Sequence, residues 1–458
     1  MRRVLQMTGL PLIIAFVVAV VLMIVAISKF KVHPFLSIMG VSLLLALVAG
    51  IKLTDIPNVI GAGFSGTFSS IGIVIILGAF IGSVLEATGA ALKLADMVIK
   101  LVGKKNPELA MELMGWVVSI PVFCDSGFVI LDPIRRALVR RTGTSSVAMT
   151  VALSTGLYIS HVFIPPTPGP IAAANTLGIG DNLLMVMGLG LLCSIFPLVA
   201  GLIYAKFIGK RVKSADEMGD SGEVVKTYEE LVAEYGKLPS GLNSLAPLLV
   251  PVALMALGTI GSMAGFSGFI ADLFTFLGKP VIALAAGTIL AIIQLGTAKK
   301  MEKFYDLTND TLKTVGPILF VTAAGGVLGK VISSTTMVSF ITEKAPALMS
   351  MGIFFPFLLA AILKTAQGSS TVAITTTAGI MVSLMEPMGL NTPVLAALTV
   401  MAIGAGAMTV SHANDSYFWV VTNFGKMTPQ QGYKTQTILT LVMGIASIIG
   451  IFVLSLIF

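Results

Sequence analysis

A carboxylate and a hydroxyl interrupt the apolar run at residues 119–131, which reads SIPVFCDSGFVIL. Asp125 and Ser126 stand there between Pro121 and Gly127. If the run lies in a membrane, an ionised Asp costs about 2.5–3.5 kcal/mol and irregular backbone is tolerated only against protein or a water-filled cavity. We therefore expect Asp125 to face an internal cavity and to accept a proton there. The alternative is a structural Asp that caps a broken helix.

The densest polar run in an apolar region is KTAQGSSTVAITTTAG, at residues 364–379. Its hydroxyls and amide suit the hydroxyl groups of a ligand, and the start of a broken helix suits a carboxylate. Lys364 is the only cation in residues 345–409, so it would pair with an anionic substrate, or else reach toward a membrane interface. The candidate binding side chains of this run are Lys364, Gln367, Ser369, Ser370 and Thr371.

Two further segments break the helical pattern. Residues 160–175 contain four prolines and close with an Asn, and residues 411–425 begin SHANDS directly after an apolar stretch. The candidate binding side chains of these segments are Thr167, Asn175, His412, Asn414 and Ser416. Ser126 of the first break is a further candidate binding side chain. Asp415 is, with Asp125, a candidate proton carrier. We expect all four polar breaks to converge on one site near the middle of the membrane.

The composition is that of a helical membrane protein. Of the 458 residues, 56% are hydrophobic and only 11% are charged, and the mean hydropathy is +0.97. Soluble domains carry about 25% charged residues. Apolar stretches long enough to cross a bilayer recur along the whole chain, and the first of them is too long for a signal peptide. The net charge of +7 is attributed to cytoplasmic loops rather than to nucleic-acid binding.

The sequence contains no signature of a cofactor, metal site or enzyme. Its three histidines are far apart, its two cysteines lie in apolar segments, and neither a nucleotide-binding nor a zinc-binding motif is present. No catalytic constellation is evident. ATP-driven pumping by this chain alone is therefore not expected, and we predict neither a cofactor nor a metal.

The polar segment at residues 209–240 divides the chain into two halves, 1–208 and 241–458. Each half has the same order of a Gly-rich helix, a polar break, a helix, a second polar break and a helix. This order predicts an internal repeat.

Charge predicts that the two repeats are inverted. The first break is bracketed by basic loops with only about 26 apolar residues, 109–134, between them, which is too few for two spans. A single span would place one basic loop outside, so a re-entrant hairpin is favoured. The second hairpin, near 349–385, lacks flanking positive charge and would enter from the opposite face. The alternative is two helices that are merely kinked at Pro and Gly.

Five segments together resemble the gluconate permease (GntP) family, within the ion transporter superfamily. They are KFKVHPFL (29–36), IPVFCDSGFVILDP (120–133), VFIPPTPGPIAAA (162–174), TAQGSSTVAITTT (365–377) and SHANDSYFWVV (411–421). The resemblance implies a multi-pass symporter of the bacterial inner membrane for gluconate or a related sugar acid, driven by the proton motive force. It also implies a homodimer whose transport domains move against a scaffold.

The chain departs from the family in two segments. Many gluconate permeases carry a Glu where this chain has Asp125 and an apolar residue where it has Ser126. Some carry Arg where this chain has Lys364, and Arg offers a two-pronged fork where Lys offers a point charge. Both segments are expected to bind the substrate, so these departures affect substrate recognition. Glycerate or another small carboxylate, and sodium in place of the proton, therefore stay open.

These observations predict an all-α polytopic membrane protein with about 11–12 transmembrane helices and two re-entrant hairpins in two inverted halves. The substrate carboxylate would meet Lys364 and the helix start near Ser369, and the partners would be a small organic anion, protons and the lipid bilayer. A passive channel and a membrane-embedded enzyme are the remaining rivals.

Overall fold

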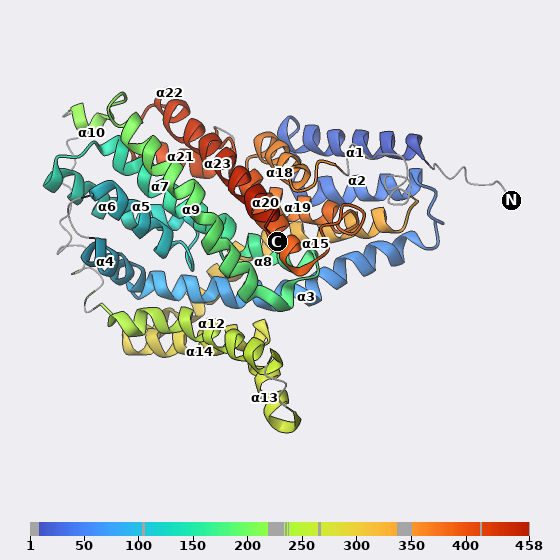
Figure 1. Ribbon diagram of the computed structural model, residues 1–458, viewed down its shortest axis with the longest axis horizontal. Coiled ribbons are helices and arrows are strands. Elements are labelled where there is room, and N and C mark those ends of the chain that lie inside the picture. The colour runs from blue at the N-terminus through green and yellow to red at the C-terminus, as the bar shows by residue number, and fades with distance from the viewer. Residues whose placement is uncertain are drawn as a thin grey trace.

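The described part of the chain is helical throughout, as Figure 1 shows for this computed structural model. The structure describes residues 9–102, 106–218, 233, 236, 238–263, 267–336, 350–412 and 415–457. The prediction of an all-α membrane protein is confirmed.

Seven helical stretches among the described residues are long and apolar enough to cross a membrane. They are Leu10–Ile27, Ser146–Thr176, Gly180–Ile208, Gly241–Gly258, Pro280–Thr297, Met301–Ser333 and Pro429–Ser455. A bent pair, Gly72–Ala87 with Ala90–Val98, makes an eighth if it is one span. Five shorter apolar helices accompany them, and three of these, Phe354–Ala366, Ser370–Met381 and Pro393–Met408, border the predicted breaks of the C-terminal half. The predicted number of 11–12 spans stays a prediction.

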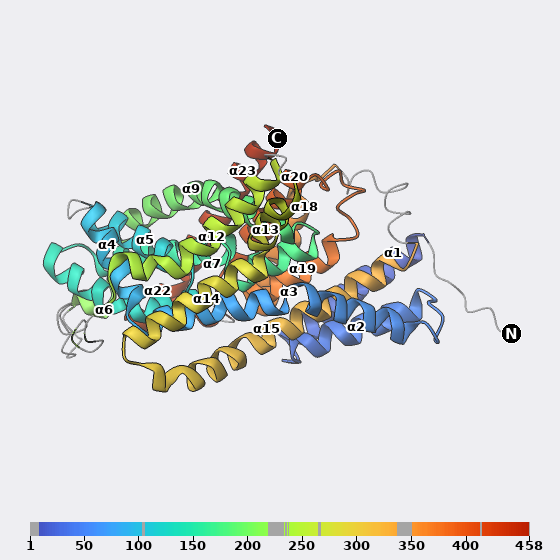
Figure 2. The same ribbon diagram turned by 90° about the horizontal axis from the view of Figure 1, so that it is seen from below.

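Long helices form one side of the molecule (Figure 2). Their bounds are α2 (Pro34–Val48), α3 (Ile56–Ala87), α12 (Gly241–Met263), α14 (Pro280–Thr297) and α15 (Phe304–Ser333). Helices α3 and α15 approach closely where Gly63 meets Val327, since a Cβ on Gly63 would lie 2.7 Å from Val327 Cα. Phe35 and Phe64 pack around Phe320, with centroids 5.9 and 6.4 Å from its ring, and fix α2 on the same pair.

Other helices surround these long helices and the broken helices described below. They are α1 (Leu10–Ser28), α4 (Ala90–Val102), α9 (Leu183–Ile208), α10 (Ala215–Met218), α13 (Gly268–Gly278), α22 (Pro429–Gly432) and α23 (Ile438–Ser455). Figure 1 shows α13 projecting beyond α12 and α14.

Both breaks of the N-terminal half occur where the sequence predicts them. The first separates α5 (Pro107–Val118) from α6 (Cys124–Thr142), and the second separates α7 (Ser146–Phe163) from α8 (Pro168–Thr176). Pro121 cannot donate a backbone hydrogen bond, and the Ser119 hydroxyl donates to the carbonyl of Val122 across the loop. Gly82 of α3 lets the Pro121 carbonyl approach, because a Cβ there would collide with it.

The C-terminal half repeats this pattern. Helix α18 (Phe354–Gln367) ends at Gly368, whose φ of 91° is a left-handed conformation that favours glycine. Helix α19 (Ser370–Met381) begins directly afterwards, capped by the Ser369 hydroxyl, which accepts from the Val372 N–H. Helix α20 (Pro393–Met408) and α21 (Ser416–Phe424) flank the fourth break.

Parts of α6, α7 and α21 that lie away from the breaks meet at one end of the molecule. The buried Arg135 near the end of α6 donates to the Ser146 hydroxyl at the start of α7 over 2.6 Å and to the Phe424 carbonyl at the end of α21 over 3.2 Å. We call this end the basic rim, because Arg136 and Arg140 lie on the same last turns of α6. Helix α5 runs beside α7, so both arms of the first hairpin point toward this rim.

The other pair of returning helices runs the opposite way. The residues at the C-terminal ends of α8 and α19, including Asn175 and Ser383, line one cavity together. Thus α6 and α21 lead from the breaks to the basic rim, while α8 and α19 lead away from it. Opposite senses are expected of inverted repeats. Most of residues 219–240 lies outside the described part, and the proposed boundaries at 208 and 241 stay a prediction.

Candidate substrate site

Three helices begin around one cavity of about 280 Å³. They are α6, α19 and α21, and α7 closes the cavity from the side. Its lining residues are Phe123, Cys124, Asp125, Tyr158, His161, Gly368, Ser369, Ser370, Thr371, Asp415, Ser416 and Tyr417. This volume is at the small end of the range for ligand sites, so the cavity suits a small molecule.

The helix starts give the cavity the character of an anion site. The first N–H groups of a helix have no acceptor within that helix, and the helix dipole adds about half a positive charge at that end. Ser369 and Asp415 each use a side-chain oxygen to cap one such N–H, of Val372 and Tyr417 respectively. Helix starts of this kind are suited to binding an anion such as a carboxylate.

Three buried polar atoms at the cavity lack a hydrogen-bond partner among the described residues. They are Oδ1 of Asp125, the hydroxyl of Tyr158 and Nδ1 of His161. All three residues line the cavity, and the His161 ring lies near Phe123 and Tyr158, with centroid distances of 6.0 and 6.5 Å. Unsatisfied buried polar atoms are costly, so their presence at a cavity indicates groups that a ligand or a proton would satisfy.

Lys364 lies directly behind the cavity and pairs with Asp415. Its Nζ is 2.5 Å from Asp415 Oδ2 and also donates to the Gly368 carbonyl, and its side chain is 0% exposed. The hydroxyl of Ser411 donates to the same carboxylate oxygen over 2.5 Å. The pair therefore ties the last turn of α18 to the first turn of α21.

The structure brings together six of the predicted site residues. Asp125, Ser369, Ser370, Thr371, Asp415 and Ser416 line the cavity. Ser126 follows Asp125 on α6 but is not part of the lining. His412 is held away from it by a 2.9 Å hydrogen bond between Nε2 and the Thr365 carbonyl. Asn414 lies outside the described residues, as does the side chain of Gln367.

Two predicted residues lie elsewhere. Thr167 caps no N–H group, and its hydroxyl donates to the Ile164 carbonyl within the break. Asn175 lines a different cavity of about 360 Å³, between α3, α8 and α15. The cause is the length of α8, which carries Asn175 about 10 Å beyond Pro168 at 1.5 Å per residue.

The sequence analysis missed the aromatic wall of the site. Tyr158 and His161 come from α7, and Tyr417 from α21, where its hydroxyl donates to the Ser154 carbonyl over 3.3 Å. The rings of Tyr158 and Tyr417 are 5.0 Å apart. The spacing of Tyr158 and His161, three residues apart directly before a proline-rich break, places them on one face of a helix and was the available signal.

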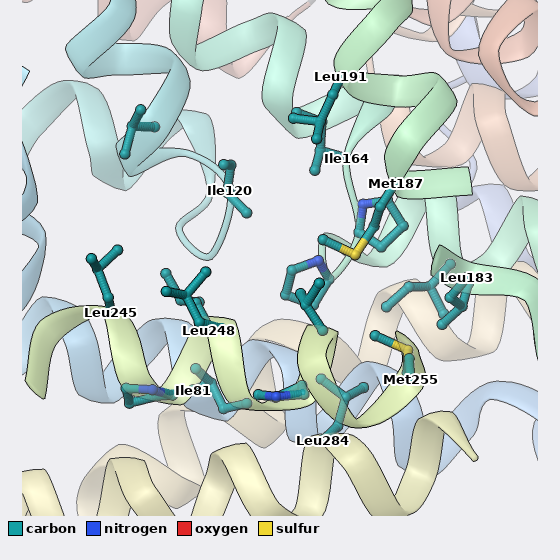
Figure 3. Close-up of a pocket in the computed structure, with 18 residues that line it drawn as sticks. Ile81, Ile120, Ile164, Leu183, Met187, Leu191, Leu245, Leu248, Met255 and Leu284 are labelled. Carbon is teal, nitrogen blue, oxygen red and sulfur yellow. The ribbon is translucent and has the colours of Figure 1, made fainter. Parts of the chain in front are cut away.

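A third cavity, of about 230 Å³, is entirely apolar (Figure 3). On one side it is lined by α12 and α14, including Leu248, Met255 and Leu284, and on the other by the first two breaks, including Ile120 and Ile164. It offers no polar group to a sugar acid. Among the described residues no group of three or more His, Cys, Asp or Glu is placed to hold a metal ion.

Known proteins resemble this chain over nearly its whole length. The model of the GntP family permease family matches residues 10–457. An uncharacterized permease of Haemophilus influenzae is 34% identical over 91% of this chain and 86% of its own length. The inner membrane permease YgbN of Escherichia coli is 32% identical, covering 96% of this chain and 97% of its own. The low-affinity gluconate transporter of the same species is 30% identical, covering 97% and 98%.

The fold is also similar to that of a solved transporter. The YdaH transporter of Alcanivorax borkumensis superposes with a TM-score of 0.61 at 15% sequence identity, covering 92% of this chain and 97% of that one. At this identity the likeness concerns the fold alone. The family resemblance inferred from the five sequence segments is confirmed by the family match and the relatives. The chain belongs to the GntP permease family, and it is a multi-pass permease of the bacterial inner membrane rather than an enzyme.

Proposed function

We propose that the chain is a proton-coupled symporter of gluconate or a related sugar acid. The observation that carries this proposal is the meeting of three helix starts around Asp125, in a cavity small enough for such a substrate. The similarity to a gluconate transporter over 97% of the chain supports the same substrate class.

The substrate carboxylate would bind at the first turns of α19 and α21. Their free N–H groups and dipoles favour an anion without a side-chain cation. Lys364 is engaged by Asp415 and Gly368, so its contribution is to hold these two helix starts in place. The hydroxyl groups of the acid would form hydrogen bonds with the ring of His161 and with the hydroxyls of Ser370, Thr371 and Ser416.

Asp125 would couple the proton to the substrate. Its carboxylate and that of the substrate would share one small cavity, where two like charges oppose each other strongly because the surroundings are poor in water. A proton on Asp125 removes this repulsion and supplies a donor to the substrate. Binding of the anion would then require binding of a proton. Asp415 is less suited to this role, because Lys364, Ser411 and Tyr417 already satisfy its oxygens.

Transport would follow an elevator-like alternating-access cycle. The apolar cavity of Figure 3 separates α12 and α14 from the breaks that surround the substrate site. An interface that offers only Ile, Leu, Val, Met and Pro side chains there can slide without exchanging hydrogen bonds. We propose that the helices carrying the breaks move against α12 and α14, and that two copies of the chain join through such scaffold helices.

Uptake of a panel of labelled acids into proteoliposomes tests this proposal. The panel contains gluconate, idonate, glycerate and a dicarboxylate, each offered under an imposed pH gradient or an imposed sodium gradient. We expect concentrative uptake of a sugar acid that follows the pH gradient and is abolished by a proton ionophore. Uptake that follows sodium and ignores the ionophore would establish the sodium-coupled alternative instead, and preference for glycerate would change the substrate. Equilibration without accumulation would indicate a passive channel.

A further inference from the structure

A second acid lies buried in the first hairpin, away from the substrate cavity. Glu112 of α5 is 1% exposed, and its Oε1 has no hydrogen-bond partner among the described residues. It does not line the substrate cavity. An ionisable side chain buried at membrane depth is costly, and it is retained chiefly where it has a function.

The depth of Glu112 is set by its packing on α7. The Glu112 carbonyl lies against Gly156, where a Cβ would collide with it. Gly156 is ten residues beyond Ser146 at the basic rim, or about 15 Å along the helix. His161, which lines the substrate cavity, is five residues farther, or about 7 Å. Glu112 thus lies between the rim and the cavity.

Polar groups continue from Glu112 toward the cavity. Trp116 is one turn farther along α5, and its Nε1 also lacks a partner among the described residues. The Ser160 hydroxyl donates to the Trp116 carbonyl over 2.5 Å, and its neighbour His161 has the unpartnered Nδ1 described above. Residues with unsatisfied atoms therefore follow one another along α5 and α7, from the level of Glu112 to that of the cavity.

Four helices surround α5 and carry the ionisable neighbours of Glu112. Helices α4, α6, α7 and α9 pack against α5. Their ionisable side chains in the described part are Lys93, Asp96, Lys100, Cys124, Asp125, Asp132, Arg135, Arg136, Arg140, Tyr158, His161, Cys193, Tyr204 and Lys206, together with Glu108 on α5 itself. Lys93 and Lys100 pair with Asp96, and Arg135 and Arg136 pair with Asp132. Lys206 lies on α9, which packs against α5.

We propose that Glu112 is a proton-relay site between the basic rim and the substrate cavity. Because about 7 Å along α7 separates the level of Glu112 from that of His161, a water molecule completes the path. The O–H bond of a protonated Glu112 breaks as an O–H bond forms on this water, and another O–H bond of the water breaks as an N–H bond forms on His161. An N–H bond of the resulting imidazolium then breaks as an O–H bond forms on Asp125. One proton moves in total, and both the water and the neutral imidazole are restored. The negative charge left on Glu112 is offset by Lys206 until the next proton arrives from the rim. This inference rests on the proposed proton coupling.

The test compares Glu112→Gln with the wild-type chain in proteoliposomes. The probe is labelled gluconate, or the acid of the panel that the wild-type chain accumulates best. Three quantities are measured: exchange of labelled for unlabelled acid at equal pH, accumulation under a pH gradient, and proton entry reported by an internal dye. We expect exchange within twofold of wild type, accumulation at least tenfold lower, and loss of substrate-dependent proton entry. Glu108→Gln, one turn nearer the rim and half-buried, is the matched control and should stay within twofold in all three.

Each other outcome decides the matter. If Glu112→Gln admits protons and accumulates acid as the wild type does, Glu112 is merely a buried neutral side chain and the relay is wrong. Loss of exchange in the folded variant would also contradict the relay. Should Glu112→Gln not fold, Glu112→Asp is expected to accumulate acid with a displaced pH profile, and an unchanged profile, or failure of this variant to fold as well, overturns the relay. If the wild-type chain itself accumulates acid without proton entry, the proposed coupling fails independently of any variant.

Discussion

Lys364 and Asp415, fifty-one residues apart in the chain, form a buried ion pair with Nζ 2.5 Å from Oδ2. The pair joins the end of one broken helix to the start of another, with Asp415 lining the cavity and Lys364 behind it. Since Lys364 also donates to the Gly368 carbonyl, one amine fixes both the left-handed turn before α19 and the cap of α21. The helix starts that we propose to bind substrate are held in place by this contact.

Removal of Lys364 should destabilise the protein more than removal of the pair. Lys364→Met leaves Asp415 buried without its cation, which costs about 3–5 kcal/mol in comparable cases. Adding Asp415→Asn should recover at least half of the lost thermal stability, measured on the purified protein in detergent. Lys313→Met breaks the exposed 2.9 Å pair with Asp310 and serves as the control, with an effect of about 1 kcal/mol or less. A double variant no more stable than Lys364→Met would contradict this view of the pair.

Replacement of the buried Arg135 by Lys should destabilise the protein. It donates to Asp132, Ser146 and Phe424, and a Lys amine cannot reach such divergent acceptors at once. We expect Arg135→Lys to cost about 3 kcal/mol or more in unfolding free energy. Arg140→Lys, at an exposed position on the same helix, should change it by about 0.5 kcal/mol at most. Equal effects of the two substitutions would show that the rim contacts do not stabilise the fold.

Replacement of Gly329, where α15 is in close contact with α19, should lower both the stability and the transport rate of the protein. A Cβ at this position of α15 would collide with the Gly379 carbonyl of α19 and lie 2.9 Å from Val382 Cγ1. Gly329→Ala should therefore cost about 1–3 kcal/mol and lower the transport rate, because α19 begins at the substrate cavity. Gly316→Ala on the same helix meets nothing within 4 Å and should preserve both, as thermal unfolding and uptake assays would reveal.

The two hairpins should open to opposite faces of the membrane. In a background with Cys124 and Cys193 changed to Ala, single cysteines at Asn106 and Thr144 flank the first hairpin, and one at Glu386 follows the second. An impermeant thiol reagent should label the first two from one side and the third from the other. Labelling of positions 106 and 144 from different sides would rule out the re-entrant arrangement.

The sequence predicted the helix breaks because their causes are local. Pro121, the prolines near residue 165, and Gly368 end helices through their own backbone restrictions, whatever surrounds them. The convergence of the first, third and fourth breaks on one cavity was expected from the cost of polar groups in a membrane. The expectation that all four breaks converge is wrong for the second, because Pro165 and Pro166 line the apolar cavity instead. The family resemblance could be read from the same segments.

The partners within the site could not be predicted in this way. Whether Lys364 meets a substrate or Asp415 depends on how α18 and α21 pack, and no local signal carries that information. The length of α8, rather than its residue types, takes Asn175 to another cavity. Glu112 lies in an apolar helix where only the packing of α5 on α7 reveals that it is buried.

The central claim is that a proton on Asp125 accompanies each substrate anion into the cavity. Asp125→Asn keeps the size of the side chain and its capacity to donate, but it cannot take up or release the proton. The decisive measurement is labelled sugar-acid uptake by this variant in proteoliposomes, once with a pH gradient and once as exchange at equal pH. The account predicts that gradient-driven accumulation is lost while exchange persists. Wild-type accumulation by Asp125→Asn would contradict it.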